Sequence, residues 1–349
     1  MEIKRRKTRQ ISVGNVKIGG NAPIVIQSMA KTNTKDVEAT VKQIRILQKA
    51  GCEIVRVAVQ DLASAKAIKQ IKKEIELPLV ADIHFHYKLA LEAIENGADK
   101  IRLNPGNIFK TQEIKEIVAC AKQQKIPIRV GLNSGSVKRQ NNSLAESLVK
   151  GALDYIKILE RMNFFDIVVS LKASNIQDTL EAYRKCQSLC DYPFHLGITA
   201  AGSPKQGLIK SSIGLGILLS EGIGDTIRVS LTSQPQEEVY AAKGILESLG
   251  LRKFGIEVIS CPTCGRCEVN LIDKVKIIEE KLSRANINHK QPKKIAIMGC
   301  FVNGPGEAKE ADIGIAFGRK YGLIFQNGKI IKKLPEEKTV DYILKELKR

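Results

Sequence analysis

Two groups of residues in the sequence have types and spacings that suggest chemistry. The first group is made of cysteines: Cys261, Cys264 and Cys267 form a C-x2-C-x2-C motif, and Cys300 follows 36 residues after Cys264. The second group is made of lysines and arginines that stand alone within short apolar runs. Thiolates bind soft metals, and buried cations bind anions. The sequence therefore suggests a metal centre and an anion site.

The cysteine spacing favours a metal over disulfides in a chain that we expect to be cytosolic. A zinc ribbon would normally have a second C-x2-C near Cys300, and the sequence has none. Three clustered thiols with a remote fourth ligand are more typical of an iron–sulfur cube. Zinc, or thiols without a metal, remain the alternatives. We expect Cys52, Cys120, Cys186 and Cys190, which lie in predicted helices or at their ends, to be buried and inert.

The isolated cations lie in or at the end of five apolar runs, and they are Arg56, Arg102, Arg129, Lys172 and Arg228. A buried cation is costly unless an anion meets it, and arginine suits bidentate phosphate contacts. We expect these side chains to form a pocket for a compact polyanion, with neutral hydrogen bonds from Asn104, Asn133 and Ser230. The alternative is pairing with nearby acids, namely Glu53, Asp82, Asp166 and Asp225. His84, His86 and His195 lie near predicted strand ends, where hydrogen bonding or packing is a more common role than metal ligation.

The elements that carry these residues form a repeated pattern. Eight apolar runs alternate with stretches of helical period, and they are Ile24–Met29, Ile54–Val59, Leu79–Ile83, Lys100–Leu103, Ile128–Leu132, Ile167–Leu171, His195–Thr199 and Thr226–Leu231. Near-continuous apolar runs are typical of parallel strands covered on both faces. Eight such units predict an α/β fold, a TIM (β/α)8 barrel, over residues 1–254. The rival is a doubly wound open sheet.

The pattern changes after Gly250. A strand-like FGIEVIS precedes the cysteine motif, and a helix is expected from about Val269 to Ala285. Two further strands, a hairpin with Asn327–Gly328 at its turn, and a terminal helix from Glu336 complete the pattern. We expect residues 255–349 to form a separate small α+β domain that carries the metal.

Composition excludes several classes. The chain has 349 residues, 43% of them hydrophobic, with 56 Lys and Arg against 37 Asp and Glu, a formal charge of +19. Such a chain can bury a large core, which argues against disorder, and the charge suggests an anionic partner or substrate. Trp is absent and aromatics are 5%, too few for base-stacking platforms. No apolar run approaches the roughly 18 residues of a membrane span, and no secretory signal is recognisable, so we expect a cytoplasmic protein.

Several motifs together resemble those of the bacterial 4-hydroxy-3-methylbut-2-enyl-diphosphate synthases, which act in the methylerythritol phosphate route to isoprenoids. The resemblance covers nearly the whole chain. Its most specific parts are ISCPTCGR at 259–266 and MGCFVNGPGEA at 298–308, and VADIHF at 80–85, IRLNPGN at 101–107 and KSSIGLGILLSEGIGDTIRVSL at 210–231 also match. The chain is similar to the short two-domain form of the family.

The resemblance implies reductive ring opening of 2-C-methyl-D-erythritol 2,4-cyclodiphosphate with two electrons. It implies a [4Fe-4S] cluster on Cys261, Cys264, Cys300 and Glu307, with Glu307 and Asn303 acting near the substrate. It also implies diphosphate binding by the residues already named for the anion pocket: Arg56, Arg102, Asn104, Arg129, Asn133, Lys172, Arg228 and Ser230. Ferredoxin or flavodoxin would donate electrons, and a head-to-tail homodimer would bring one subunit's cluster domain to its partner's barrel.

Two positions depart from the family pattern. Cys267 is an extra thiol that competes with Glu307 as a ligand. HLGITAAG at 195–202 has Ala200 where the family typically has a glutamate regarded as a proton donor, so the protonation route is open. The alternatives from other classes are a zinc-stabilised basic nucleic-acid-binding protein and a cluster-containing hydro-lyase without net redox change.

Overall fold

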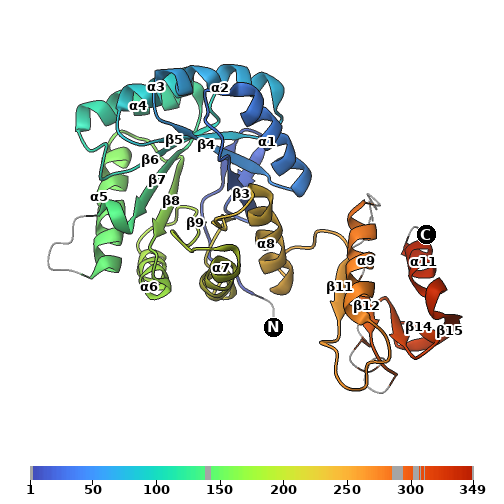
Figure 1. The fold of residues 1–349 in the computed structure, drawn as a ribbon. Helices are drawn as coiled ribbons and strands as arrows, with labels where there is room; N and C mark the ends of the chain where they lie inside the picture. Colours follow the sequence, from blue (N-terminus) through green and yellow to red (C-terminus); the bar gives the residue numbers. More distant parts are fainter. Residues whose placement is uncertain are drawn as a thin grey trace. The chain divides into compact units, whose positions relative to one another are not determined.

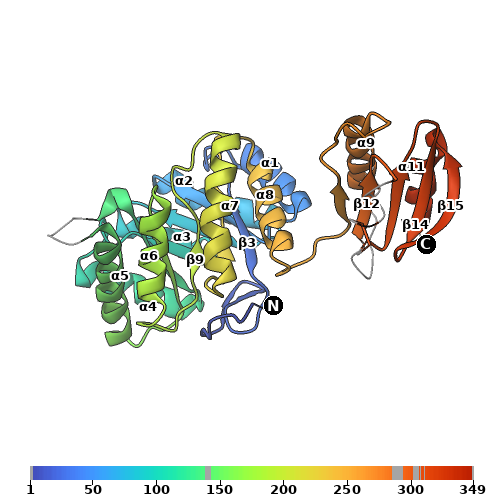
Figure 2. The same ribbon diagram turned by 90° about the horizontal axis from the view of Figure 1, so that it is seen from below.

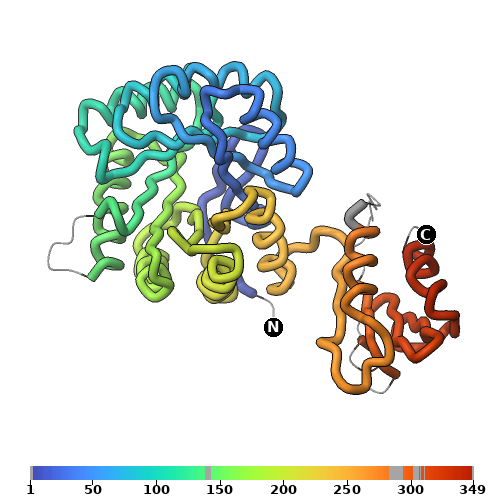
Figure 3. Tube along the Cα trace, viewed as in Figure 1, coloured from blue at the N-terminus to red at the C-terminus, as the bar shows by residue number. Residues whose placement is uncertain are grey.

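The structure is a computed structural model that describes residues 3–137, 143–284, 294–301, 306, 308–309 and 311–347. The chain divides into two compact units, Met1–Arg252 and Lys253–Arg349. It passes from one to the other once, through the segment after the last barrel helix (Figure 3). Among the described residues, no helix combines the length and the apolar character that a membrane span requires.

The first unit is a closed parallel barrel. Its strands are β3 (Val25–Met29), β4 (Ile54–Val59), β5 (Leu79–Ile83), β6 (Lys100–Leu103), β7 (Ile128–Asn133), β8 (Ile167–Lys172), β9 (His195–Leu196) and β10 (Thr226–Ile227). They are ordered β8-β7-β6-β5-β4-β3-β10-β9, and a parallel bridge between Val169 and Phe194 joins β8 to β9. Closure confirms the predicted TIM barrel, and the open-sheet alternative is wrong. The last two strands are shorter than predicted.

The helices surround the strands (Figure 1). They are α1 (Val37–Ala50), α2 (Leu62–Glu74), α3 (Tyr87–Glu95), α4 (Thr111–Gln124), α5 (Leu144–Arg161), α6 (Ile176–Cys186), α7 (Pro204–Ser220) and α8 (Pro235–Ser248). Local signals set their ends: the Asp36 side chain caps α1, Gly51 ends it in the left-handed conformation, and prolines begin α7 and α8. Figure 2 shows α5, α6, α7, α8 and α1 side by side around the barrel.

An N-terminal hairpin covers the amino end of the barrel. Strands β1 (Ile11–Val13) and β2 (Val16–Ile18) pair antiparallel, and their side chains Ile11, Val13 and Ile18 are buried. They pack with residues from the beginnings of four barrel strands, namely Val25, Ile54, Val80 and Val168. This floor of apolar side chains seals the amino end, so polar groups inside the barrel face its carboxyl end.

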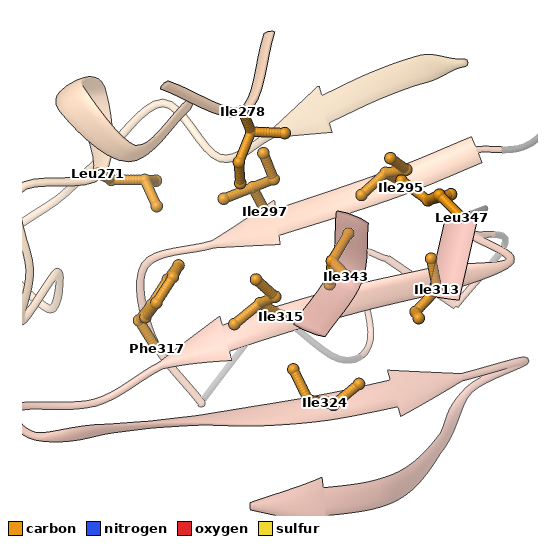
Figure 4. Close-up of a cluster of buried hydrophobic side chains, with 10 residues drawn as sticks. All are labelled: Leu271, Ile278, Ile295, Ile297, Ile313, Ile315, Phe317, Ile324, Ile343 and Leu347. Atoms are coloured by element: carbon orange, nitrogen blue, oxygen red, sulfur yellow. The ribbon is translucent and has the colours of Figure 1, made fainter. Parts of the chain in front are cut away.

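In its described residues, the second unit has a five-stranded mixed sheet on which helices pack. Strands β11 (Glu257–Ser260), β12 (Lys294–Met298) and β13 (Ile313–Phe317) are parallel, and β14 (Tyr321–Gln326) and β15 (Lys329–Pro335) continue antiparallel. Helices α9 (Leu271–Arg284) and α11 (Glu336–Leu347) pack on one face of the sheet, where isoleucines dominate the core (Figure 4). Asn327 and Gly328 both have positive φ, as expected for the tight hairpin turn predicted there.

Candidate active site

The predicted cations project into the barrel from adjacent strands. Arg102 lies opposite both Asp82 and Arg129 in the strand ladders, and Asn133 lies opposite Lys172. Because side chains alternate along a strand, these paired positions share the interior face. Arg56, Arg102, Arg129 and Lys172 are all less than a tenth exposed. The structure therefore brings together the side chains that the sequence had singled out.

Asp82 is the anionic centre of this group. Its carboxylate lies 3.2 Å from Nη1 of Arg102 and 3.6 Å from Nε of Arg56. Burial raises the pKa of Asp82, but the charges of Arg56 and Arg102 outweigh it and lower that pKa to about 2. Burial, together with Arg228 and Arg102, lowers the pKa of Arg56 to about 10 against the opposing effect of Asp82. The acid-pairing alternative therefore holds for these two arginines.

Arg228 has a different acid partner, which the sequence reasoning missed. Its Nη2 lies 3.4 Å from Oε2 of Glu238 on α8. The same carboxylate accepts hydrogen bonds from the Leu231 backbone N–H at 3.1 Å and the Ser28 hydroxyl at 3.3 Å, and Lys31 lies 3.1 Å away. The signal available in the sequence was the position of Glu238, an acidic residue in the first turn of an apolar helix. Two of the other acids considered pair elsewhere: Glu53 with Arg252 and Asp225 with Arg5.

Arg129 and Lys172 have no carboxylate partner within the described part of the chain. Nε and Nη1 of Arg129 are buried there without any hydrogen-bond partner. Lys172 Nζ is hydrogen-bonded instead to Nε2 of His195, at 3.1 Å. Burial and the neighbouring arginines lower the pKa of both groups well below the ordinary values. Arg129 has unpaired buried donors and Lys172 has no counter-ion, and both conditions are expensive, so these two side chains form the part of the site that an incoming anion would satisfy.

Two further interior residues escaped the sequence reasoning. Lys100 is fully buried on β6, and its Nζ has no hydrogen-bond partner among the described residues. Both polar atoms of the Gln27 amide on β3 are likewise buried and unpartnered there. The signal was present, because Lys100 precedes Arg102 by two positions and therefore shares its face. Both residues enlarge the unsatisfied polar surface inside the barrel.

The three neutral residues lie at the same strand ends as the cations. Asn104 is 5% exposed, and its Oδ1 accepts the Gly106 N–H at 3.2 Å. Asn133 ends β7, and Ser230 lies half-buried three residues beyond the end of β10. They are placed to add hydrogen bonds around the same anion.

The cysteines of the second unit lie at the carboxyl ends of two neighbouring parallel strands. Cys261 directly follows β11, and Cys300 lies two residues after β12. The Gly299 N–H donates to Sγ of Cys261 at 3.3 Å. Hydrogen bonds of this kind to sulfur are among the factors that tune iron–sulfur sites. The donor set therefore suits a soft metal or cluster.

The other two thiols of the motif differ in their surroundings. Cys264 is exposed, whereas Cys267 is half-buried and donates from Sγ to the Val269 carbonyl at 3.2 Å. A Cβ on Gly299 would fall 2.4 Å from Cys267 Sγ, so glycine is required there. No three potential metal ligands are gathered into one group within the ranges that the structure describes. Glu307 and Asn303 lie outside those ranges.

The expectation for the four remaining cysteines is correct in part. Cys52 and Cys186 are buried, as predicted, but Cys120 and Cys190 are only partly buried. Burial raises the pKa of Cys52 to about 12, consistent with an inert thiol. Cys190 lies beyond the end of α6, and its Sγ is 3.9 Å from that of Cys186. Loss of helical structure after Cys186 explains its exposure.

Ala200 lies in an exposed turn after β9, in the left-handed conformation with φ of 49°. Its methyl group offers neither a proton nor a hydrogen bond.

The fold and the cation-lined interior define the protein as a barrel enzyme for a small anionic molecule, with a thiol-bearing second module. Comparisons with known proteins identify the family within this class.

The chain matches two family models, the GcpE TIM-barrel domain over residues 8–243 and the GcpE protein C-terminal domain over residues 257–349. It is 54% identical to the 4-hydroxy-3-methylbut-2-en-1-yl diphosphate synthase (flavodoxin) of Fusobacterium nucleatum, covering 99% of this chain and 96% of that protein. The protein of the same name from Caldanaerobacter subterraneus is also 54% identical, covering 99% and 98%. The chain belongs to the GcpE family of 4-hydroxy-3-methylbut-2-en-1-yl diphosphate synthases.

Solved structures of other proteins superpose on the barrel of this chain. Dihydropteroate synthase from Stenotrophomonas maltophilia superposes with a TM-score of 0.54 at 12% identity, covering 70% of this chain and 97% of that one. The Xanthomonas albilineans enzyme in complex with 7,8-dihydropteroate gives 0.52 at 14% identity, covering 69% and 98%. This likeness concerns the fold alone. Family membership supports the predicted synthase rather than the nucleic-acid-binding alternative.

Proposed function

We propose that this chain opens the ring of 2-C-methyl-D-erythritol 2,4-cyclodiphosphate reductively and releases (E)-4-hydroxy-3-methylbut-2-enyl diphosphate and water. The observation that carries the proposal is the set of buried cations in the barrel, of which Arg129 and Lys172 have no carboxylate partner within the described ranges. A cyclic diphosphate is a compact dianion that would meet them. The relatives' names support the same reaction.

The residues proposed to bind the diphosphate are Arg56, Arg102, Asn104, Arg129, Asn133, Lys172, Arg228 and Ser230. Two electrons and one proton convert the dianion into a linear diphosphate with one more negative charge, and a hydroxyl leaves as water. The broken C–O bond leaves its electron pair on a phosphate oxygen. Negative charge therefore increases beside the arginines during the reaction. Fixed cations stabilise this developing charge in the transition state more strongly than they stabilise the smaller charge of the bound substrate.

We further propose that residues 1–254 form the substrate domain and residues 255–349 the cluster domain. A [4Fe-4S] cluster held by Cys261, Cys264, Cys300 and Glu307 would supply the two electrons. Glu307 would hold the fourth iron through a carboxylate, which binds iron more weakly than a thiolate does. Asn303 would contact the substrate from the same segment.

Flavodoxin appears in the relatives' names as part of the enzyme's designation. We propose that flavodoxin or ferredoxin supplies electrons to this chain in the cytoplasm, and that a head-to-tail homodimer brings the cluster domain of one subunit to the barrel of its partner. These donors are generally acidic, and a net charge of +19 would speed their encounter at low salt.

The test is anaerobic turnover of the cyclic diphosphate by the full-length, cluster-reconstituted protein with an artificial low-potential reductant. The expected product is the linear allylic diphosphate, detected by mass spectrometry. The expected protein is brown, with broad visible absorbance. A colourless protein holding one equivalent of zinc, with no turnover, would overturn the proposal.

A further inference from the structure

His195 makes a short chain of hydrogen bonds inside the barrel. It is completely buried on β9, its Nε2 lies 3.1 Å from Lys172 Nζ, and its Nδ1 lies 2.7 Å from Thr226 Oγ1 on β10. The imidazole therefore connects three adjacent strands. A buried histidine bonded at both ring nitrogens has a fixed orientation.

The direction of these bonds follows from the charge of the surroundings. An ammonium group only donates, so a protonated Lys172 requires an unprotonated Nε2 on His195. The remaining proton of the neutral ring is then on Nδ1 and points to Thr226 Oγ1. Burial, and after it the charges of Lys172, Arg129, Lys100 and Arg56, lower the pKa of His195 well below its ordinary value. The ring is therefore neutral and accepts from Lys172.

The backbone holds this pair rigidly. The Tyr183 hydroxyl on α6 donates to the His195 carbonyl at 2.6 Å and accepts the Leu171 N–H at 3.0 Å. The strand that carries Lys172 is thus tied to the strand that carries His195. Gly197 leaves room for the amine, because a Cβ there would fall 2.5 Å from Lys172 Nζ.

We propose that His195 is a positioning residue that holds the Lys172 amine in the anion site by accepting its hydrogen bond. The inference rests on the proposed function, since it names how one of the diphosphate-binding side chains is held and kept protonated. Apart from His195, the groups that act electrostatically on the Lys172 amine are all cations. They are Arg129 on β7, Arg56 on β4, Arg102 on β6 and Arg228 after β10.

The neutral imidazole favours the charged form of Lys172, because a hydrogen bond accepted from an ammonium stabilises it. Burial and the four arginines act in the opposite direction and lower the pKa of Lys172. Losing the acceptor would lower it further. Lys172 must be protonated to attract a phosphate oxygen, so affinity would then fall at a lower pH than in the parent.

Two substitutions separate positioning from space filling. His195→Gln puts an amide oxygen near the Nε2 position, where it can still accept from Lys172. His195→Asn puts its amide near the Nδ1 position, where it reaches Thr226 but not Lys172. Each variant is measured for kcat and KM with the cyclic diphosphate from pH 6.5 to 9.5, and for affinity toward inorganic diphosphate by calorimetry. Melting temperature and visible spectrum report the fold and cluster content.

We expect His195→Asn to lower kcat/KM roughly 10- to 100-fold and to move its alkaline limb to lower pH. His195→Gln should recover kcat/KM to within about fivefold of the parent. In a Lys172→Met background, His195→Asn should have almost no further effect, because the two residues act as a pair. Equal impairment of the two histidine variants with an unshifted pH profile would overturn the inference.

The calorimetric readout keeps the two proposals apart. If the parent fails to turn over the cyclic diphosphate but His195→Asn alone weakens diphosphate binding, the proposed function fails and the positioning role stands. If the parent turns over and all histidine variants bind diphosphate as the parent does, the positioning role fails and the function stands.

Discussion

Arg129 and Arg102 are neighbours on adjacent strands, yet the structure gives them different energetic roles. Arg102 donates to Asp82 and to the Gly131 carbonyl at 2.8 Å, whereas Nε and Nη1 of Arg129 have no partner in the described part of the protein. A buried charge without a partner destabilises the fold, and an unpaired donor is available to a ligand. The two arginines should therefore respond in opposite ways to removal.

We expect Arg129→Met to raise the melting temperature of the ligand-free protein and to weaken cyclic diphosphate binding about 10- to 100-fold. Arg102→Met is the matched control, and it should lower the melting temperature because it leaves Asp82 short of a partner. Differential scanning calorimetry and binding titrations measure both effects. An Arg129→Met protein that is less stable than the parent and binds the substrate equally well would contradict the assignment.

Cys267 has a structural use that does not require a metal. Its Sγ donates to the Val269 carbonyl and packs beside Gly299 and Leu271. We expect Cys267→Ala to keep the iron content, the visible spectrum and most of the activity. Cys261→Ala, the comparison variant, should lose the cluster. Iron analysis of both proteins decides the matter, and loss of iron from Cys267→Ala alone would reverse the ligand assignment.

Ala200 lies where the resemblance to the family predicts a glutamate, and a methyl group transfers no proton. General acid–base assistance is typically worth about 10²–10⁴-fold. We favour another proton donor in this chain, so Ala200→Glu should change kcat and its pH dependence only modestly. Ala200→Gln has the same size without a titrating group and serves as the control. A gain of orders of magnitude in Ala200→Glu, absent in Ala200→Gln, would show that the parent is impaired in proton delivery.

At the level of elements, the N-terminal hairpin supplies the floor of the barrel. Ile18 is fully buried against the first residues of the strands. We expect Ile18→Ala to reduce the free energy of unfolding by roughly 2–5 kcal/mol, the usual cost of truncating a buried isoleucine. Lys17→Ala, on the exposed side of the same strand, should change it by less than about 0.5 kcal/mol. Equal stability of the two variants in denaturant titrations would mean that the hairpin is not part of the barrel core.

The alternation of apolar runs and stretches of helical period was sufficient to predict the barrel. Strands β4, β5 and β6 have the predicted bounds. Strands β9 and β10 are only two residues each. Apolar character reports burial rather than pairing: Ile198 after β9 and Val229 after β10 are buried although they lie outside the strands.

The site was predictable where one residue type stood out from its surroundings. Isolated arginines in apolar runs identified the anion site, but their pairing depends on which strands become neighbours, so Asp82 emerged as a shared partner only in three dimensions. Lys100 was missed because it is the first residue of its run, and Gln27 because an uncharged amide did not stand out within its run. Glu238 was missed because it lies on a helix and reaches the site from outside the barrel wall.

For the whole molecule, an excess of buried positive charge predicts how stability depends on pH. Burial and neighbouring arginines lower the pKa values of Lys100 and Lys172 well below 10.5 in the folded state. The unfolded chain then binds more protons than the folded chain, so stability rises with pH between the folded and unfolded pKa values. Above 10.5 both states are neutral at these lysines, and that contribution no longer changes.

We therefore expect the melting temperature of the ligand-free protein to rise between pH 6 and pH 9. A saturating diphosphate should raise the melting temperature at every pH, and at 100 times Kd the gain in stability is about 2.7 kcal/mol. At one fixed diphosphate concentration, the gain should be larger at low pH than at high pH. Lys100→Met should flatten the pH dependence. A ligand-free protein whose stability falls steadily from pH 6 to 9 would contradict this account.

The floor of the barrel also has a consequence for the order of events during synthesis. The segment leading into the hairpin is fastened by residues made much later: Arg6 Nη1 donates to the Cys190 carbonyl at 2.7 Å, and Arg5 pairs with Asp225 at 2.9 Å. About 200 residues separate these partners, which is on the order of 10–40 s of translation at roughly 5–20 residues per second. Through most of that interval the apolar side of the hairpin also lacks Val168, the last of its barrel partners to be made. These early residues are thus among the last to be secured, and a nascent chain stalled before Asp225 would expose them to chaperones.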